Sequence, residues 1–209
     1  MKLEICLLDL ETVIPSEAAI RSLPFGQGEM LRLLAIGNLS ARRQSLGALL
    51  ALEELLKSGG YAPDLILRGE NGKPYFQGET PQFNLSHTER FSVAALATSP
   101  IGIDVELLRP ERDFGGIVRR FFAEEERARW EAEPTAEQFY RLWTQKEARA
   151  KRCGAGLLKP TGGEAGVLRS FRLRRGDTVA YLSIAAYEPI ERIDWHHHIK
   201  ELYIDKRTN

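Results

Sequence analysis

Residues 101–107 have the sequence IGIDVEL, in which large apolar residues alternate with small or acidic ones at a strict period of two. In an extended strand this period puts the isoleucines, Val105 and Leu107 on one face and the two acids, Asp104 and Glu106, on the other. One face therefore packs into a core, while the other carries two carboxylates side by side. The pattern restricts the segment to a sheet with one apolar face.

The two carboxylates admit two interpretations. Carboxylate oxygens held together on a rigid strand are the ligands that Mg²⁺ prefers, together with water and phosphate oxygens. Polar residues at every second position are also typical of the outer face of an ordinary half-buried strand. The spacing alone leaves both interpretations open.

Strands and helices are predicted in both halves of the chain. Apolar runs predict further strands over residues 2–9, 65–67, 74–76, 83–85, 91–97, 171–173 and 179–186. Helical spacing predicts a helix capped by Ser40 and stopped by Gly59-Gly60, helices over 117–122 and 124–131, and a longer one from about Ala136 to Cys153 that ends at Gly154. The dipeptide Asn71-Gly72 predicts a hairpin turn.

This order of elements predicts an α+β fold with two lobes, one over residues 1–99 and one over 100–209 that carries the acids. The 209 residues are enough for two small lobes but not for a long multidomain assembly. No low-complexity linker separates the halves, so the lobes are expected to pack together.

The predicted helix near residue 145 holds a second candidate cluster. Trp143, Glu147 and Lys151 are four residues apart in turn, so they share one helix face, with Lys146 beside them. A carboxylate with two lysines suits phosphoryl transfer, because it can bind a metal or a proton while the lysines pair with phosphate oxygens. A Glu and a Lys four residues apart are also a common surface pair.

Composition excludes several classes of protein. The 29 Lys and Arg residues balance the 29 Asp and Glu residues, which argues against a general nucleic-acid binder. The two cysteines lack metal-site spacing, acids interrupt the apolar N-terminus, and no apolar stretch is long enough for a membrane span. We therefore expect a cytoplasmic protein that contacts neither nucleic acid nor membrane.

Taken together in chain order, the two clusters form a family signature. The segments IGIDVE and WTQKEARAK resemble the (V/I)G(I/V)D and (F/W)xxKExxxK motifs of the 4'-phosphopantetheinyl transferases, specifically their large Sfp-like branch. The segments NGKP at 71–74 and FNLSHT at 83–88 resemble two further family motifs, and ARRQSLG at 41–47 resembles the start of the first family helix. The resemblance runs from about Ala41 to Leu157.

The resemblance implies a pseudo-dimer of two similar α+β lobes in one chain, with coenzyme A between them. It implies transfer of the phosphopantetheine arm of coenzyme A to a serine of an apo acyl, peptidyl or aryl carrier protein, with release of 3',5'-ADP. Asp104, Glu106 and Glu147 would hold Mg²⁺ on the pyrophosphate. Glu147 would also take the serine proton, directly or through a metal-bound water, and we expect Asp104 and Glu147 to face solvent.

The family also implies a set of residues on coenzyme A. Lys151 would act in catalysis by contacting the pyrophosphate, with Lys146 nearby, and Ser86 and His87 would contact phosphates. Lys73 and Pro74 would flank the adenine, and Arg43 would meet the 3'-phosphate. Glu126 resembles a further family acid near the metal. Family lysines are missing from residues 28–31, so Arg21, Arg32 or Arg42 would have to substitute.

Two other functions stay open at this stage. One is a Mg²⁺-dependent hydrolase of coenzyme A or another pyrophosphate, because acids with lysines suit any such substrate. The other is a non-catalytic protein that binds coenzyme A or a carrier, although such a protein has no need of three carboxylates. Two lobes in one chain predict a monomer, and no motif identifies the carrier.

Overall fold

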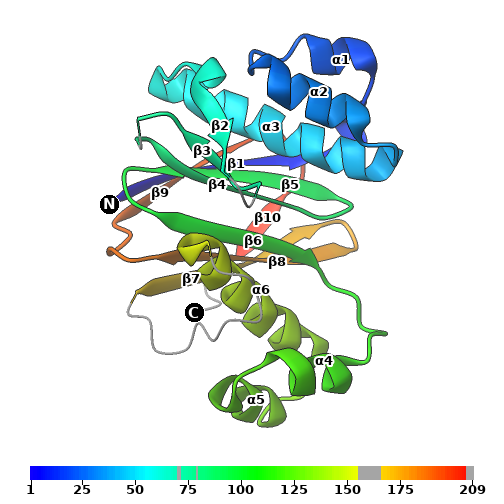
Figure 1. The fold of residues 1–209 in the computed structure, drawn as a ribbon. Coiled ribbons are helices and arrows are strands. Elements are labelled where there is room, and N and C mark those ends of the chain that lie inside the picture. Colours follow the sequence, from blue (N-terminus) through cyan, green and yellow to red (C-terminus); the bar gives the residue numbers. More distant parts are fainter. Residues whose placement is uncertain (70–71, 79, 155–165, 206–209) are drawn as a thin grey trace.

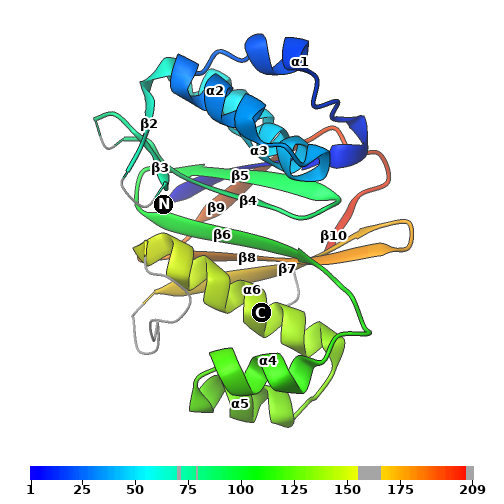
Figure 2. The same cartoon turned by 45° about the vertical axis from the view of Figure 1, so that its right-hand side comes forward.

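Two four-stranded sheets pack face to face, and each carries one long helix on its outer side, as Figures 1 and 2 show. The structure is a computed structural model that describes residues 1–69, 72–78, 80–154 and 166–205. The predicted α+β fold of two lobes in one chain is confirmed.

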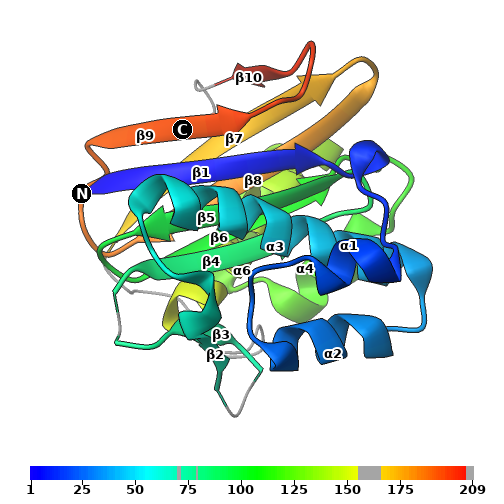
Figure 3. The ribbon, with the colours of Figure 1, turned by 90° about the horizontal axis from the view of Figure 1, so that it is seen from above.

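The first sheet has the strand order β4-β5-β1-β9, formed by Gln82–His87, Phe91–Ala97, Lys2–Asp9 and Arg192–His197. The helix α3 (Leu39–Gly59) covers its outer face, and α1 (Glu17–Arg21) and α2 (Gln27–Ala35) lie beside α3 (Figure 3). A small hairpin of β2 (Ile66–Arg68) and β3 (Pro74–Phe76) extends from this lobe.

The second sheet has the strand order β10-β7-β8-β6, formed by Tyr203–Asp205, Val167–Arg175, Thr178–Ala186 and Ile101–Leu107. The helix α6 (Ala136–Cys153) packs on its outer face, and α4 (Phe114–Phe121) and α5 (Glu124–Glu131) lie at one end of α6 (Figure 1). Short 3₁₀ helices at Leu10–Thr12 and Pro63–Leu65 complete the described elements.

The main core lies between the two sheets. Ile101, Ile103 and Val105 of β6 point into it, opposite Ile5 and Val93 of the first sheet. The period of two predicted for residues 101–107 is therefore confirmed, because alternate side chains of β6 face this core. The other face of β6 lies against α6.

One expectation about local structure is wrong, and another falls partly outside the described residues. The first long helix begins one residue before Ser40, because the side chain of Asn38 accepts the capping hydrogen bond from the amide of Ala41 at 3.0 Å. At the hairpin, β2 and β3 pair as predicted and Gly72 adopts a left-handed φ of 74°, whereas Asn71 lies outside the described residues.

The sequence patterns did not predict four of the described elements, namely α1, α2, β9 and β10. The strand β9 belongs to the C-terminal half but pairs in parallel with β1, so it completes the first sheet. The lobe boundary between residues 99 and 100 stays a prediction, although β9, which follows this boundary in sequence, lies in the sheet of the N-terminal lobe. Among the helices of the described ranges, none is long and apolar enough to cross a bilayer.

Candidate functional site

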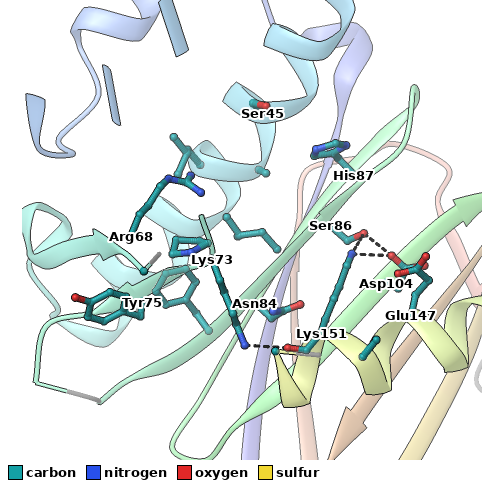
Figure 4. A pocket seen from close by; sticks show the side chains of 18 of the residues that line it. Ser45, Arg68, Lys73, Tyr75, Asn84, Ser86, His87, Asp104, Glu147 and Lys151 are labelled. Atoms are coloured by element: carbon teal, nitrogen blue, oxygen red, sulfur yellow. Dashed lines mark hydrogen bonds and ion pairs between the residues drawn. The ribbon is translucent and has the colours of Figure 1, made fainter. Parts of the chain in front are cut away.

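A pocket of about 1100 Å³ opens between α3 and α6, above the line where β4 meets β6 (Figure 4). Side-chain hydrogen bonds join these two edge strands: the amide of Ile103 donates to Asn84 Oδ1 at 3.0 Å, and the amide of Val105 donates to Ser86 Oγ at 3.3 Å. The polar residues that line the pocket include Arg32, Ser45, Arg68, Lys73, Tyr75, Asn84, Ser86, His87, Asp104, Glu106, Glu147 and Lys151.

Three carboxylates, Asp104, Glu106 and Glu147, line this pocket, and we call them the acid cluster. Asp104 and Glu106 come from β6, and Glu147 comes from the facing surface of α6. The helix approaches β6 so closely that a methyl group on Gly102 would lie 1.9 Å from the carbonyl oxygen of Ala148. Glycine at position 102 thus lets the third acid approach the other two.

Asp104 is buried, with only 4% of its surface exposed, so the expectation that it faces solvent is wrong. Ser86 Oγ donates to Asp104 Oδ1 at 2.8 Å, and Lys151 Nζ donates to the same carboxylate oxygen at 2.7 Å. Lys151 also donates to Ser86 Oγ at 2.9 Å (Figure 4). These three side chains form a closed triangle of hydrogen bonds that removes Asp104 from water.

The other two acids are half-buried and hold their protons more tightly than usual. Burial raises the pKa of Glu106 to about 7, and the charge of Asp104 adds to the effect. Burial likewise raises the pKa of Glu147 to about 7, with repulsion from Asp104 as the next cause. The acid cluster thus concentrates negative charge that the surrounding side chains neutralise only in part.

The acid cluster has the chemistry of a divalent-cation site that other ligands must complete. In the part of the chain that the structure describes, no three acidic, histidine or cysteine side chains converge as a ready-made metal site. Mg²⁺ does not need one, since it commonly takes one or two carboxylates and fills its shell with water and substrate phosphates. Asp104 Oδ2 is buried without a hydrogen-bond partner among the described residues. A cation would relieve both this unpaired oxygen and the repulsion between the acids.

Positive groups surround the rest of the pocket. Lys73, from the β2–β3 hairpin, reaches across to α6 and donates to the carbonyl oxygen of Lys151 at 2.8 Å, near the C-terminal end of that helix (Figure 4). His87 and Pro74, which the resemblance places on coenzyme A, also line the pocket.

Two arginines of the pocket share one buried acid. Glu29, 6% exposed, accepts hydrogen bonds from Arg32 Nε at 3.0 Å and from Arg68 Nη2 at 2.9 Å. Burial acts to raise the pKa of Glu29, but hydrogen bonds and charge from Arg68 and Arg32 outweigh it, so the pKa lies below its usual range. Arg32 is one of the three arginines expected to substitute for the missing lysines, whereas no sequence motif marks Arg68.

Three predicted residues have surroundings that differ from the expectation. Arg43 is exposed and is not among the described residues that line the pocket. Lys146 is buried and binds Glu126 at 3.0 Å, so these two residues neutralise one another beside the pocket. The hydroxyl hydrogen of Ser86 is used on Asp104, so of the predicted hydroxyl or amide contact to a phosphate only the amide contact stays a prediction.

The raised pKa values predict how stability depends on pH. Without added divalent cation, Glu106 and Glu147 ionise near pH 4.5 when unfolded but near pH 7 when folded, so folding retains protons in this range. The free energy of unfolding should therefore fall as the pH rises from about 4.5 to 7, and level off above. Across this range, the free energy of unfolding of the wild type should fall by roughly 2 kcal/mol relative to that of the double variant Glu106→Gln/Glu147→Gln. This figure already includes the reduction by solvent screening.

Urea denaturation of both proteins at several pH values measures this difference. The comparison isolates the two acids from every other group that titrates in the same range. Parallel pH profiles for the two proteins would show that neither acid has a raised pKa.

Comparison with known proteins connects this geometry to a family. Residues 100–203 match the family model ACPS, described as the 4'-phosphopantetheinyl transferase superfamily. The chain is 36% identical over 143 residues to a 4'-phosphopantetheinyl transferase of Bacillus subtilis, and the aligned region covers 66% of this chain and 60% of the relative. It is 34% identical over 125 residues to the 4'-phosphopantetheinyl transferase gsp of Aneurinibacillus migulanus, and the aligned region covers 57% of this chain and 52% of that relative. The chain thus spans about half to three fifths of the length of these relatives.

Proposed function

Because this chain belongs to the 4'-phosphopantetheinyl transferase superfamily, we propose that it transfers the phosphopantetheine arm of coenzyme A to a serine of an apo carrier protein and releases 3',5'-ADP. The observation that carries the proposal is a single large pocket that joins the acid cluster to two lysines and an arginine pair. A pyrophosphate that bears a nucleotide 3'-phosphate needs such a combination of charges.

In the proposed mechanism Asp104, Glu106 and Glu147 would hold Mg²⁺, which would supply positive charge to neutralise the departing phosphate. Lys151 pairs with a pyrophosphate oxygen from the end of α6. Glu147 takes the proton from the carrier serine, directly or through a water, because its carboxylate lines the pocket beside the other two acids. Ser86 keeps Asp104 in place through its hydrogen bond.

Incubation with coenzyme A, MgCl₂ and purified apo carriers tests the function. Intact mass spectrometry should show the gain of one phosphopantetheine group on the carrier, and a carrier whose acceptor serine is changed to alanine should gain nothing. Cleavage of coenzyme A without carrier labelling would instead identify a hydrolase. Binding of coenzyme A without cleavage would identify a non-catalytic binder.

Carriers of the acyl, peptidyl and aryl types belong in the same experiment, because no described feature distinguishes them. The monomeric state and the cytoplasmic location stay predictions. Size-exclusion chromatography with light scattering checks the first of these.

Recognition of the 3'-phosphate is proposed for Arg32 and Arg68 instead of Arg43. In Figure 4, Arg68 lies on the far side of the pocket from Asp104, and Glu29 holds it beside Arg32. Arg32→Gln and Arg68→Gln should each reduce the preference for coenzyme A over dephospho-coenzyme A by about tenfold, the effect of one charge-assisted hydrogen bond. Each single variant leaves Glu29 one arginine partner.

Measured kcat/KM values for the two substrates give this preference. The matched control is Arg43→Gln, which removes the same charge from the exposed surface of α3 and should leave the preference unchanged. A loss of preference in the Arg43 variant alone would restore the expectation drawn from the sequence.

A further inference from the structure

We propose that Lys151 is a built-in counter-ion of the acid cluster, which leaves Asp104 when a divalent cation binds and thereby becomes available to the pyrophosphate. The inference rests on the proposed function for the identity of the phosphate ligand. Its first half, the competition between lysine and metal, depends only on the contacts described above.

The ammonium group of Lys151 binds Oδ1 of the carboxylate that would hold the metal, beside Oδ2, which has no hydrogen-bond partner in the described part of the chain. Nζ lies 2.7 Å from Asp104 Oδ1, on a carboxylate whose side chain is 6% exposed. The positive charge of Lys151 also acts on Glu106 and Glu147, lowering the pKa that burial and repulsion raise. Lys151 therefore acts on all three acids, together with Arg112 at Glu106 and Lys146 at Glu147, and a cation bound there would compete with its charge.

Lys151 is able to leave without disrupting Asp104. Its side chain is 30% exposed and lines the open pocket, and its flexible four-carbon stem can direct the ammonium elsewhere. Ser86 stays behind, since it donates to Asp104 Oδ1 and is itself held by the amide of Val105. The carboxylate thus keeps one orienting hydrogen bond when the lysine moves.

The exchange couples the two ligands. A divalent cation that binds alone displaces Lys151 from its partner, and this displacement weakens the apparent affinity for the metal. When coenzyme A is present, the displaced ammonium gains a phosphate partner, so each ligand should strengthen the binding of the other.

Mn²⁺ is a suitable probe, because it takes the same oxygen ligands as Mg²⁺ and free Mn²⁺ is quantified by EPR. Without coenzyme A, Lys151→Met should bind Mn²⁺ at least about tenfold more tightly than the wild type, since a competing charge is gone. Addition of coenzyme A should tighten Mn²⁺ binding by a larger factor in the wild type than in this variant.

Two further variants control the result. Lys57→Met removes a lysine that is paired with Glu53 on α3 and should leave the affinity for Mn²⁺ unchanged. Lys151→Arg keeps the charge and should not reproduce the gain. Binding of Mn²⁺ by Lys151→Met that is no tighter than wild-type binding would overturn the proposal.

A measurement on the wild-type protein protects the test against a variant that does not fold. Acetylation of Lys151 by acetic anhydride, followed by mass spectrometry, should increase when Mn²⁺ is added and decrease again when coenzyme A follows. No increase with Mn²⁺ would also overturn the proposal. Failure of the proposed function has a different signature, namely no labelled carrier while the exchange between Lys151 and Mn²⁺ is still observed.

Discussion

Asp104→Asn and Glu147→Gln should each lower the rate of carrier modification by about a thousandfold, while the protein still melts close to the wild-type temperature. Each substitution removes one negative charge from the proposed metal site but retains the size of the side chain. Loss of metal-based stabilisation of the leaving phosphate and, for Glu147, loss of the base justify an effect of this size.

The amide variants are better tests than alanine variants. Asp104 is buried and receives hydrogen bonds from Ser86 and Lys151, so alanine would leave both donors without their acceptor. Asparagine keeps an acceptor oxygen there, and loss of a charge relieves the repulsion that helps raise the pKa of the neighbouring acids.

Carrier labelling, followed by mass spectrometry at saturating Mg²⁺, measures this effect, with thermal melts as the check on folding. Glu17→Gln is the matched control, because Glu17 is an exposed acid that is paired with Arg21 on α1. Near-wild-type transfer by either site variant would contradict the metal assignment.

Gly102→Ala should destabilise the protein by about 3 kcal/mol or more, as expected for overpacking against a rigid neighbour. The added methyl group would lie 1.9 Å from the carbonyl oxygen of Ala148 and 2.5 Å from the amide nitrogen of Arg152. Both atoms belong to the backbone of α6, so no side-chain rotation relieves the clash. The helix has to move away from β6, and Glu147 and Lys151 move with it.

Urea denaturation measures the loss, and Gly28→Ala is its control. Gly28 lies in α2 with no atom within 4 Å of an added methyl group, so alanine should stabilise the protein by about 0.5–1 kcal/mol. Equal stabilities for Gly102→Ala and the wild type would show that the close approach of α6 to β6 is not required.

Much of the fold could be predicted because its signals are local. The period of two in residues 101–107 and the helical spacing that ends at Gly154 identified β6 and α6, whose own residues carry those patterns. Elements without such a pattern were missed: α1 has only five residues, and β9 is identified as a strand by its pairing with β1, far away in sequence.

The sequence likewise predicted only part of the candidate site, namely residues that carry a local pattern or motif. Periodicity and the family motifs identified Asp104, Glu106, Glu147 and Lys151, and all four line one pocket. Sequence did not show that Lys146 pairs with Glu126 at 3.0 Å, nor that Arg68 shares Glu29 with Arg32. Each of these contacts depends on how one element docks against another.

By itself, the sequence determined which residue types occupy each face of β6 and α6, and therefore the acids and lysines available for chemistry. Only the tertiary structure decided their partners. It joined Lys151 to Asp104 across 47 positions and Arg68 to Glu29 across 39. The physical reason is that backbone geometry sets the face of a side chain within its own element, whereas the packing of elements sets which faces meet.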